Sequence, residues 1–150
     1  MAAIEQTPEQ LTDEQMEELA NSKKAKNTTY EGRCMYCKIV DCYDGDTVKG
    51  TFFDGNKLVQ KSFRIYGYDS PEIKPKKDLP NREEHIQKAK EAKAALEELI
   101  LNKVVIIKCL KDDKYGRTLV NIKTIDFDID IEQFMLENNH GYAYFGGAKK

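Results

Sequence analysis

The sequence predicts an α+β fold in which a closed barrel of five strands carries two to three helices on its outside. Five segments after residue 33 are rich in Val, Ile, Tyr, Phe and Thr, as strands are. Short turn signals connect the first three segments and the last two, which predicts antiparallel pairing. A long segment with apolar residues at helical spacing lies between these two groups, and a shorter one follows them.

The first 30 residues form a polar extension. They contain six acidic residues and three lysines, whereas the rest of the chain contains 20 acidic and 21 basic residues. Thr7 and Pro8 suit the N-cap and first position of a helix that would end within 21–27. Too few large apolar residues follow to bury a stable face: Leu11, Met16 and Leu19. We therefore expect a marginal helix or disorder over 1–30 and a barrel domain over 31–150.

Three strands are predicted next, over 34–43, 47–53 and 57–68. Asp44-Gly45 marks a tight bend between the first two. Asp54-Gly55-Asn56 is a hairpin signal between the second and the third. These signals predict a three-stranded antiparallel meander.

A loop over 69–80, with three prolines, separates the meander from a helix that runs to Asn102. Asn81 is the candidate N-cap, and Glu84 stands at the capping-box position. One face of this helix is apolar at helical spacing: Ile86, Ala89, Ala92, Leu96, Leu99 and Ile100.

Two further strands, over 103–110 and 117–125, flank the turn KDDKYG. A last helix over 129–139 is expected to end at Gly141, with three residues inward: Ile131, Phe134 and Met135. The order β-β-β-α-β-β-α with short antiparallel strands suits a five-stranded barrel such as the OB-fold.

Composition excludes several classes of protein. No run approaches the ~18 apolar residues of a membrane span, and the N-terminus lacks the basic and apolar regions of a signal peptide. We therefore expect an intracellular monomer without a membrane partner. The net charge is −2, so a phosphate-binding surface must be a local patch.

The chain has four cysteines, and Cys34 and Cys37 have C-x-x-C spacing. A zinc or redox site would need Cys42 and Cys109 as partners for this pair. The pair lies in a predicted strand, where residues three apart face opposite sides of the sheet. We therefore expect reduced, partly buried thiols, with the zinc or redox protein as a minor alternative.

Charged residues gather in three places within the predicted barrel: 44–47, 64–72 and 113–117. Each has a structural explanation. In the first place, Asp44-Gly45 can form a turn. In the second, Arg64 can pair with a carboxylate, and residues 69–72 can be an ordinary exit from the strand. The third can be a surface hairpin.

Together these three places indicate phosphate chemistry. Asp46 and Asp69 could supply oxygens to a hard divalent cation. Arg64 and Arg117 carry the planar forks that match phosphate oxygens. A carboxylate at Glu72 could accept a proton from water. A cation, paired guanidinium groups and a carboxylate are what phosphodiester hydrolysis requires.

These residues lie in three motifs that resemble staphylococcal nuclease, the thermonuclease family: DGDTVK at 44–49, FRIYGYDSPE at 63–72 and DKYGR at 113–117. The resemblance covers about 37–145, with matching order and intervals. It implies an OB-type barrel and a Ca2+-dependent nuclease that acts on DNA and RNA, with unpaired strands preferred. It also implies cleavage of the P–O5′ bond, which leaves 3′-phosphate ends.

The resemblance assigns residues to a calcium site. Asp46 and Asp69 match the calcium-binding carboxylates, and Asp44 matches a carboxylate behind them. Ser70 matches the residue whose backbone carbonyl faces the ion. That residue is familiarly a threonine, and serine keeps the carbonyl.

The resemblance also assigns residues to the substrate. Arg64 and Arg117 match the two arginines on the scissile phosphate, and Glu72 matches the proposed general base. Lys114 and Tyr115 match residues that contact the nucleotide and its terminal phosphate.

The chain departs from the family's pattern after the last helix, where it reads HGYAYFGGAKK. A glycine stands near one of the usual base-stacking tyrosines, and Tyr144 and Phe145 are the candidates to replace it. The alternative to an enzyme is a weak or inactive nuclease-like module that binds nucleic acid or protein. The presence of the matched carboxylates and arginines favours the enzyme.

Overall fold

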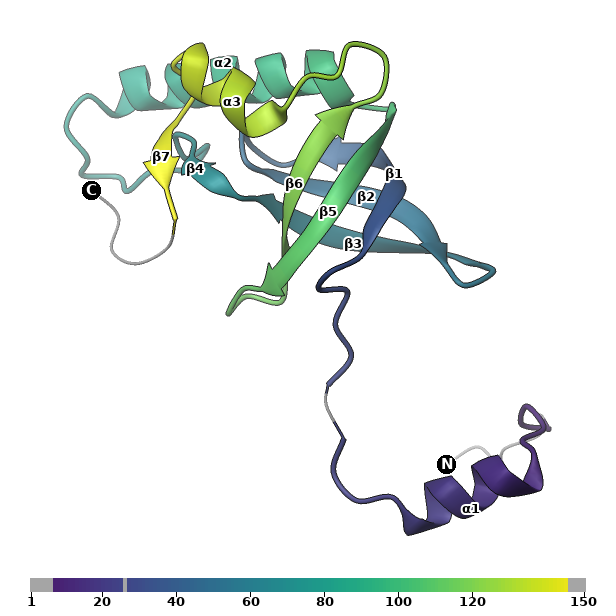
Figure 1. Cartoon of the computed structure of the whole chain (residues 1–150). Helices are drawn as coiled ribbons and strands as arrows, with labels where there is room; N and C mark the ends of the chain where they lie inside the picture. The colour runs from purple at the N-terminus through teal and green to yellow at the C-terminus, as the bar shows by residue number, and fades with distance from the viewer. Residues whose placement is uncertain (1–6, 26, 146–150) are drawn as a thin grey trace.

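The structure, a computed structural model, describes residues 7–25 and 27–145. A closed barrel with the strand order β1–β2–β3–β6–β5 forms its centre (Figure 1). Neighbouring strands are antiparallel except for β3 and β6, which are parallel. This arrangement confirms the predicted α+β barrel. The strands are β1 (Cys34–Cys42), β2 (Thr47–Asp54), β3 (Lys57–Ile65), β5 (Val104–Asp112) and β6 (Thr118–Thr124).

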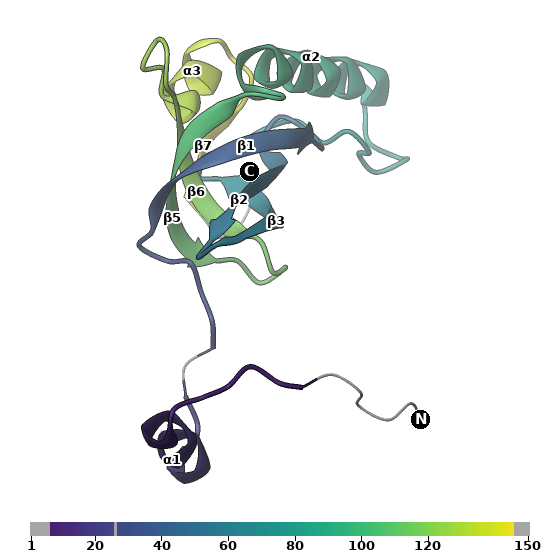
Figure 2. The same ribbon diagram turned by 90° about the vertical axis from the view of Figure 1, so that its right-hand side faces the viewer.

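Two helices lie side by side across one end of the barrel, α2 (Arg82–Ile100) and α3 (Ile131–Glu137) (Figures 1 and 2). Each buries the face that its apolar spacing predicts, except that Ile86, Leu99 and Phe134 are only partly buried. The side chains that these helices bury in the core are Ala89, Ala92, Leu96, Ile100, Ile131 and Met135.

The predicted third strand is interrupted at Tyr66. Beyond it, β4 (Gly67–Asp69) leaves the barrel and pairs with β7 (Tyr142–Tyr144). Gly67 has φ +103, and a Cβ there would collide with the carboxylate of Glu132. The positive φ favours glycine at this position, and the end of the flexible Glu132 side chain occupies the space beside it. The break carries Asp69 away from the barrel wall.

One predicted helix end is wrong, and another is placed correctly but lacks its predicted cap bond, since α2 begins directly after Asn81. Asn81 has φ 55 and makes no side-chain cap bond to α2, because N-cap bonding needs an extended backbone at that residue. At the end of α3, Asn139 rather than Gly141 adopts the left-handed conformation, with φ 60. The His140 amide then donates to the Met135 carbonyl at 2.9 Å, which closes the helix.

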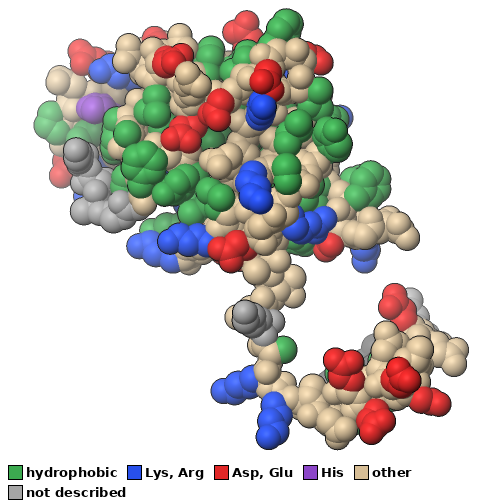
Figure 3. All heavy atoms as spheres, viewed as in Figure 1, with side chains coloured by type: hydrophobic (Ala, Val, Ile, Leu, Met, Phe, Trp, Pro, Cys, Tyr) green, Lys and Arg blue, Asp and Glu red, His purple; other side chains and the backbone are tan. Residues whose placement is uncertain are grey.

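The helix of the extension, α1 (Asp13–Asn21), begins after Thr12 rather than Thr7. Thr12 forms a capping box with Gln15, whose amide donates to Thr12 Oγ1 at 3.1 Å. No residue of α1 is buried, and the helix stands away from the barrel in both ribbon views. Its acidic side chains are exposed (Figure 3). No helix of the described residues is long and apolar enough to cross a membrane.

Deleting residues 1–27 is expected to change the free energy of unfolding by less than about 0.5 kcal/mol, because α1 buries nothing. The deletion keeps Tyr30, whose ring packs on Phe52 and whose hydroxyl donates to Asp54 at 3.1 Å. Urea unfolding of the two chains tests this. A loss above about 2 kcal/mol would show that the extension belongs to the folded domain.

Candidate active site

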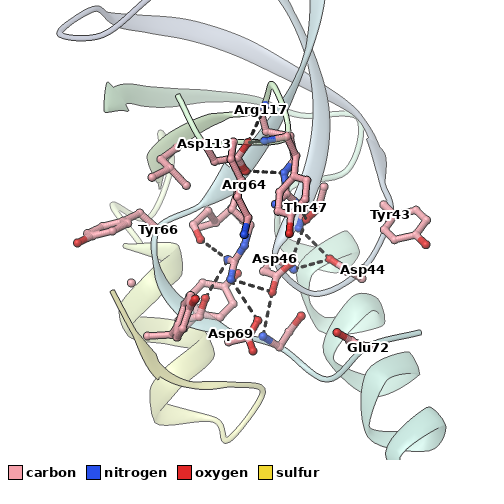
Figure 4. Close-up of a pocket in the computed structure, with 18 of the residues that line it drawn as sticks. Tyr43, Asp44, Asp46, Thr47, Arg64, Tyr66, Asp69, Glu72, Asp113 and Arg117 are labelled. Carbon is pink, nitrogen blue, oxygen red and sulfur yellow. Dashed lines mark hydrogen bonds and ion pairs between the residues drawn. The ribbon is translucent and has the colours of Figure 1, made fainter. Parts of the chain in front are cut away.

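An open cavity of about 920 Å³ is bounded by the start of β2, the end of β3, β4 and the β5–β6 turn (Figure 4). All nine residues singled out from the sequence line it: Asp44, Asp46, Arg64, Asp69, Ser70, Glu72, Lys114, Tyr115 and Arg117. The three charged segments therefore converge on one site.

Strand pairing positions the first two charges. Thr47 of β2 lies opposite Arg64 of β3 in the antiparallel ladder. The carbonyl of Asp46 accepts from the amide of Ile65 at 2.8 Å, which fixes Asp46 beside the end of β3. Asp69 arrives from β4, after the turn at Gly67.

Arg64 lies between two buried carboxylates. Its Nη2 is 3.4 Å from Asp46 Oδ2 and 3.2 Å from Asp69 Oδ1. Its Nη1 donates to the carbonyls of Ile65 at 2.6 Å and Tyr68 at 2.9 Å. The guanidinium is held in a fixed orientation, and a single cation compensates both buried anions.

Asp44 forms the turn that its Asp-Gly sequence predicts. Its Oδ1 accepts from the amides of Asp46 at 3.0 Å and Thr47 at 2.9 Å. Burial, with the neighbouring Asp46 carboxylate, raises the pKa of Asp44 to about 7. Burial alone would also raise the pKa of Asp46, but Arg64 and hydrogen bonds from Ser70 and Thr47 outweigh it and lower that pKa. Of the two carboxylates, Asp46 carries the more persistent negative charge.

Thr47 links the two arginines, a role that the sequence did not reveal. Arg117 Nη1 donates to Thr47 Oγ1 at 3.2 Å, and Thr47 Oγ1 donates to Asp46 Oδ1 at 3.0 Å. Arg117 Nε donates to Asp113 Oδ2 at 2.7 Å, which anchors the arginine to its own turn. Both guanidinium groups thus belong to one network centred on Asp46.

The remaining predicted residues lie around this network. Lys114 Nζ and Arg117 Cζ are 5.2 and 5.3 Å from the centroid of the Tyr115 ring, which is 71% exposed and accessible to a ligand. Glu72 lies in the loop after β4, on the α2 side of the cavity (Figure 4). The Glu72 carboxylate therefore belongs to a loop at the edge of the cavity and not to the barrel wall.

Tyr142 is a site residue that the sequence did not single out. It lies directly opposite Asp69 in the β4–β7 pair, and its hydroxyl donates to Asp69 Oδ2 at 2.7 Å. A Cβ on Gly141 would lie 2.8 Å from the Tyr68 ring and 2.9 Å from the Asp69 carbonyl, so glycine is needed for this approach. Burial and the bond to Asp69 raise the pKa of Tyr142 to about 12, so it remains a donor at neutral pH. The sequence signal that could have identified Tyr142 is its position after Gly141 in a segment where tyrosines alternate, at 142 and 144.

The residues around Asp46 suit a hard cation. No three His, Cys, Asp or Glu side chains within 7–25 and 27–145 group into a metal site. A cation would therefore need Asp46 and Asp69 together with backbone oxygens such as the Ser70 carbonyl, an all-oxygen set typical of Ca2+. Ser70 Oγ is buried without a hydrogen-bond partner, while the Ser70 amide donates to Asp46 Oδ2 at 3.0 Å. The Ser70 hydroxyl is thus a spare polar group on one of the residues that would hold the ion.

The four cysteines are free thiols, with Cys34 exposed and Cys37, Cys42 and Cys109 buried. Burial raises the pKa of Cys37 and of Cys42 to about 12. At pH 8 we expect a disulfide reagent to modify one thiol per native chain rapidly and all four in urea. Fast modification of two or more native thiols, or zinc in protein purified without chelator, would support the metal or redox alternative.

The barrel and its site define the class of protein: an OB-type domain with a cavity lined by arginines and carboxylates. Residues 62–148 match the sequence profile of the family described as staphylococcal nuclease homologue. The match spans more than half of the chain, which therefore belongs to this family of hydrolytic nucleases. No curated protein matches the chain. Arg64 and Asp69 lie within the matched region, and Asp46 lies before it.

Proposed function

We propose that this protein is a Ca2+-dependent nuclease that hydrolyses the P–O5′ bond of DNA and RNA and leaves 3′-phosphate ends. The observation that supports it best is the position of Arg64, held between Asp46 and Asp69 and linked to Arg117 through Thr47. Family membership supports the reaction class.

The chain's own residues would divide the work. Arg64 and Arg117 bind the scissile phosphate and stabilise the negative charge that develops at phosphorus. Glu72 accepts the proton of the attacking water, whose oxygen bonds to phosphorus as the 5′-oxygen leaves and is protonated. Lys114 and Tyr115 bind the nucleotide. Ca2+, held by Asp46, Asp69 and the Ser70 carbonyl, would neutralise a phosphate oxygen and orient the water.

A gel assay tests the proposal: single-stranded DNA, duplex DNA and RNA, each with Ca2+, Mg2+ or EDTA. We expect cleavage with Ca2+, fastest on unpaired strands, and none with EDTA, with products that a 3′-phosphatase can dephosphorylate. Binding without cleavage under every condition would instead support the inactive nucleic-acid-binding module.

Replacing Tyr142 by phenylalanine is expected to weaken calcium binding about ten-fold, because hydrogen-bond partners behind metal ligands orient those ligands. Asp69 would lose the 2.7 Å bond to the hydroxyl, while its contact with Arg64 stays. Calorimetric titration with Ca2+ measures the change. Tyr36→Phe, on an exposed part of β1, is the matched control and should not alter the affinity.

A further inference from the structure

A second cavity, of about 430 Å³, adjoins the candidate active site. The two cavities share three lining residues: Tyr66, Lys111 and Leu119. Leu110 and Lys108 line only the second one. The two cavities are therefore contiguous, and a ligand in the active site could extend past Tyr66 into the second cavity.

A β-bulge builds this cavity. Cys109 pairs with Val120 and Asp112 pairs with Thr118, so Leu110 and Lys111 of β5 together oppose the single residue Leu119 of β6. The extra residue bends the strand and re-aims its side chains, and bulges of this kind are common beside active sites. Lys111 thereby lines both cavities.

The lining suits a nucleobase. Tyr66 packs edge-on against Phe145, with ring centroids 5.7 Å apart, and two leucines complete the apolar part. Lys108 Nζ is held 2.9 Å from the Gly32 carbonyl, so one ammonium group is fixed at the wall, and Lys111 supplies a second. Glu31 also lines the cavity, so the lining carries two lysines and one carboxylate and has a net positive charge. An aromatic ring beside positive charge is the combination that binds single-stranded nucleic acid.

We propose that this cavity, which we call the bulge subsite, binds an unpaired base of a single-stranded substrate next to the nucleotide in the active site. The proposal rests on the proposed function, because the active-site cavity must hold a nucleotide for the strand to continue. It makes the protein a reader of strand length, since only substrates longer than a dinucleotide reach the bulge subsite. A duplex cannot enter, because its bases remain stacked and paired.

The test is the affinity of fluorescein-labelled (dT)2 and (dT)6 for the Glu72→Gln variant in Ca2+, measured by anisotropy. We expect (dT)6 to bind at least about ten-fold more tightly than (dT)2, because stacking one further base on an aromatic side chain increases affinity by about this factor. In the Glu72→Gln variant, the further substitutions Leu110→Glu and the neutral Leu110→Asn should reduce the ratio of the (dT)6 and (dT)2 affinities to about two-fold. The affinity for (dT)2 should not change. Leu58→Glu, at the exposed β2–β3 hairpin, adds the same charge and should change neither affinity.

Three results would overturn the proposal: equal affinities for the two oligonucleotides, an unchanged advantage in both Leu110 variants, or a duplex that binds as tightly as (dT)6. Nile red that binds at Leu110 and is not displaced by (dT)6 would assign the cavity to an apolar ligand and also overturn it. Failure of the proposed function is separate, because it would appear as wild-type protein that binds (dT)6 in Ca2+ without cleaving it.

Discussion

Replacing Arg64 by alanine is expected to lower kcat/KM for hydrolysis of single-stranded DNA by at least about 10²-fold. The Arg64 guanidinium contacts both Asp46 and Asp69, and the proposed mechanism places it on the phosphate. Calcium binding should not weaken, because the variant retains both carboxylates and removes a competing positive charge. The expected signature is lost hydrolysis with equal or tighter binding of Ca2+.

The same substitution should destabilise the metal-free protein by about 3 kcal/mol, because it leaves two buried carboxylates without their cation. Both carboxylates are buried, and the Arg64 side chain is only 11% exposed. Saturating Ca2+ should restore much of this loss, since a ligand that binds only the folded state stabilises it. Urea unfolding with and without Ca2+ measures both quantities.

Arg33→Ala is the matched control. Arg33 pairs with Asp54 at 3.3 Å, and both side chains are well exposed. Exposed ion pairs contribute at most about 1 kcal/mol, so stability should change little and hydrolysis not at all. Near-normal hydrolysis by the Arg64 variant would remove this residue from the proposed mechanism.

The parts of the fold set by local pattern could be predicted from the sequence. Strand periodicity and the Asp-Gly turns placed the five barrel strands, and the apolar stripe placed α2. Convergence of the three charged motifs could also be predicted, because strands that pair in a barrel bring their ends together.

The missing parts depend on contacts between residues distant in the sequence. The Glu132 side chain of α3 lies against Gly67, and Tyr142 meets Asp69 only because β4 and β7 pair. The role of Thr47 required the position of Arg117. Sequence periodicity does not reveal contacts of this kind between distant residues. The motifs therefore predict the charged groups of the site but not the residues that orient them.

The Asp44–Asp46 pair predicts a pH dependence of stability in the metal-free protein. The folded-state pKa of Asp44, about 7, lies above the ordinary value of 3.8, so between these values the folded state holds the proton more tightly. Stability should therefore fall as pH rises from about 4 to 7. The lowered pKa of Asp46 contributes with the opposite sign, and that contribution is lost only below about pH 4.

Asp46→Asn should differ from Arg64→Ala in its calcium binding: calcium affinity falls by at least about ten-fold, and kcat/KM falls by about 10²- to 10³-fold. Asparagine keeps one oxygen to accept from the Ser70 amide, and its NH2 group takes the position of the oxygen that accepts from the Thr47 hydroxyl, so the variant removes the charge at nearly the same size and shape. The Asp46 carboxylate also helps to raise the pKa of Asp44, so the fall in stability between pH 4 and 7 should become smaller.

Calorimetric titration with Ca2+ and urea unfolding at several pH values provide these measurements. Asp128→Asn is the control, because the Asp128 side chain is 77% exposed and pairs with Lys123, and neither residue lines the candidate active site. Two variants that both lose hydrolysis, one with weakened and the other with retained calcium binding, would establish that Asp46 acts on the ion and Arg64 on the phosphate. Unchanged calcium affinity in Asp46→Asn would show that Asp46 does not hold the ion. The arginines would then bind the phosphate without a calcium ion on the Asp46 carboxylate beside them.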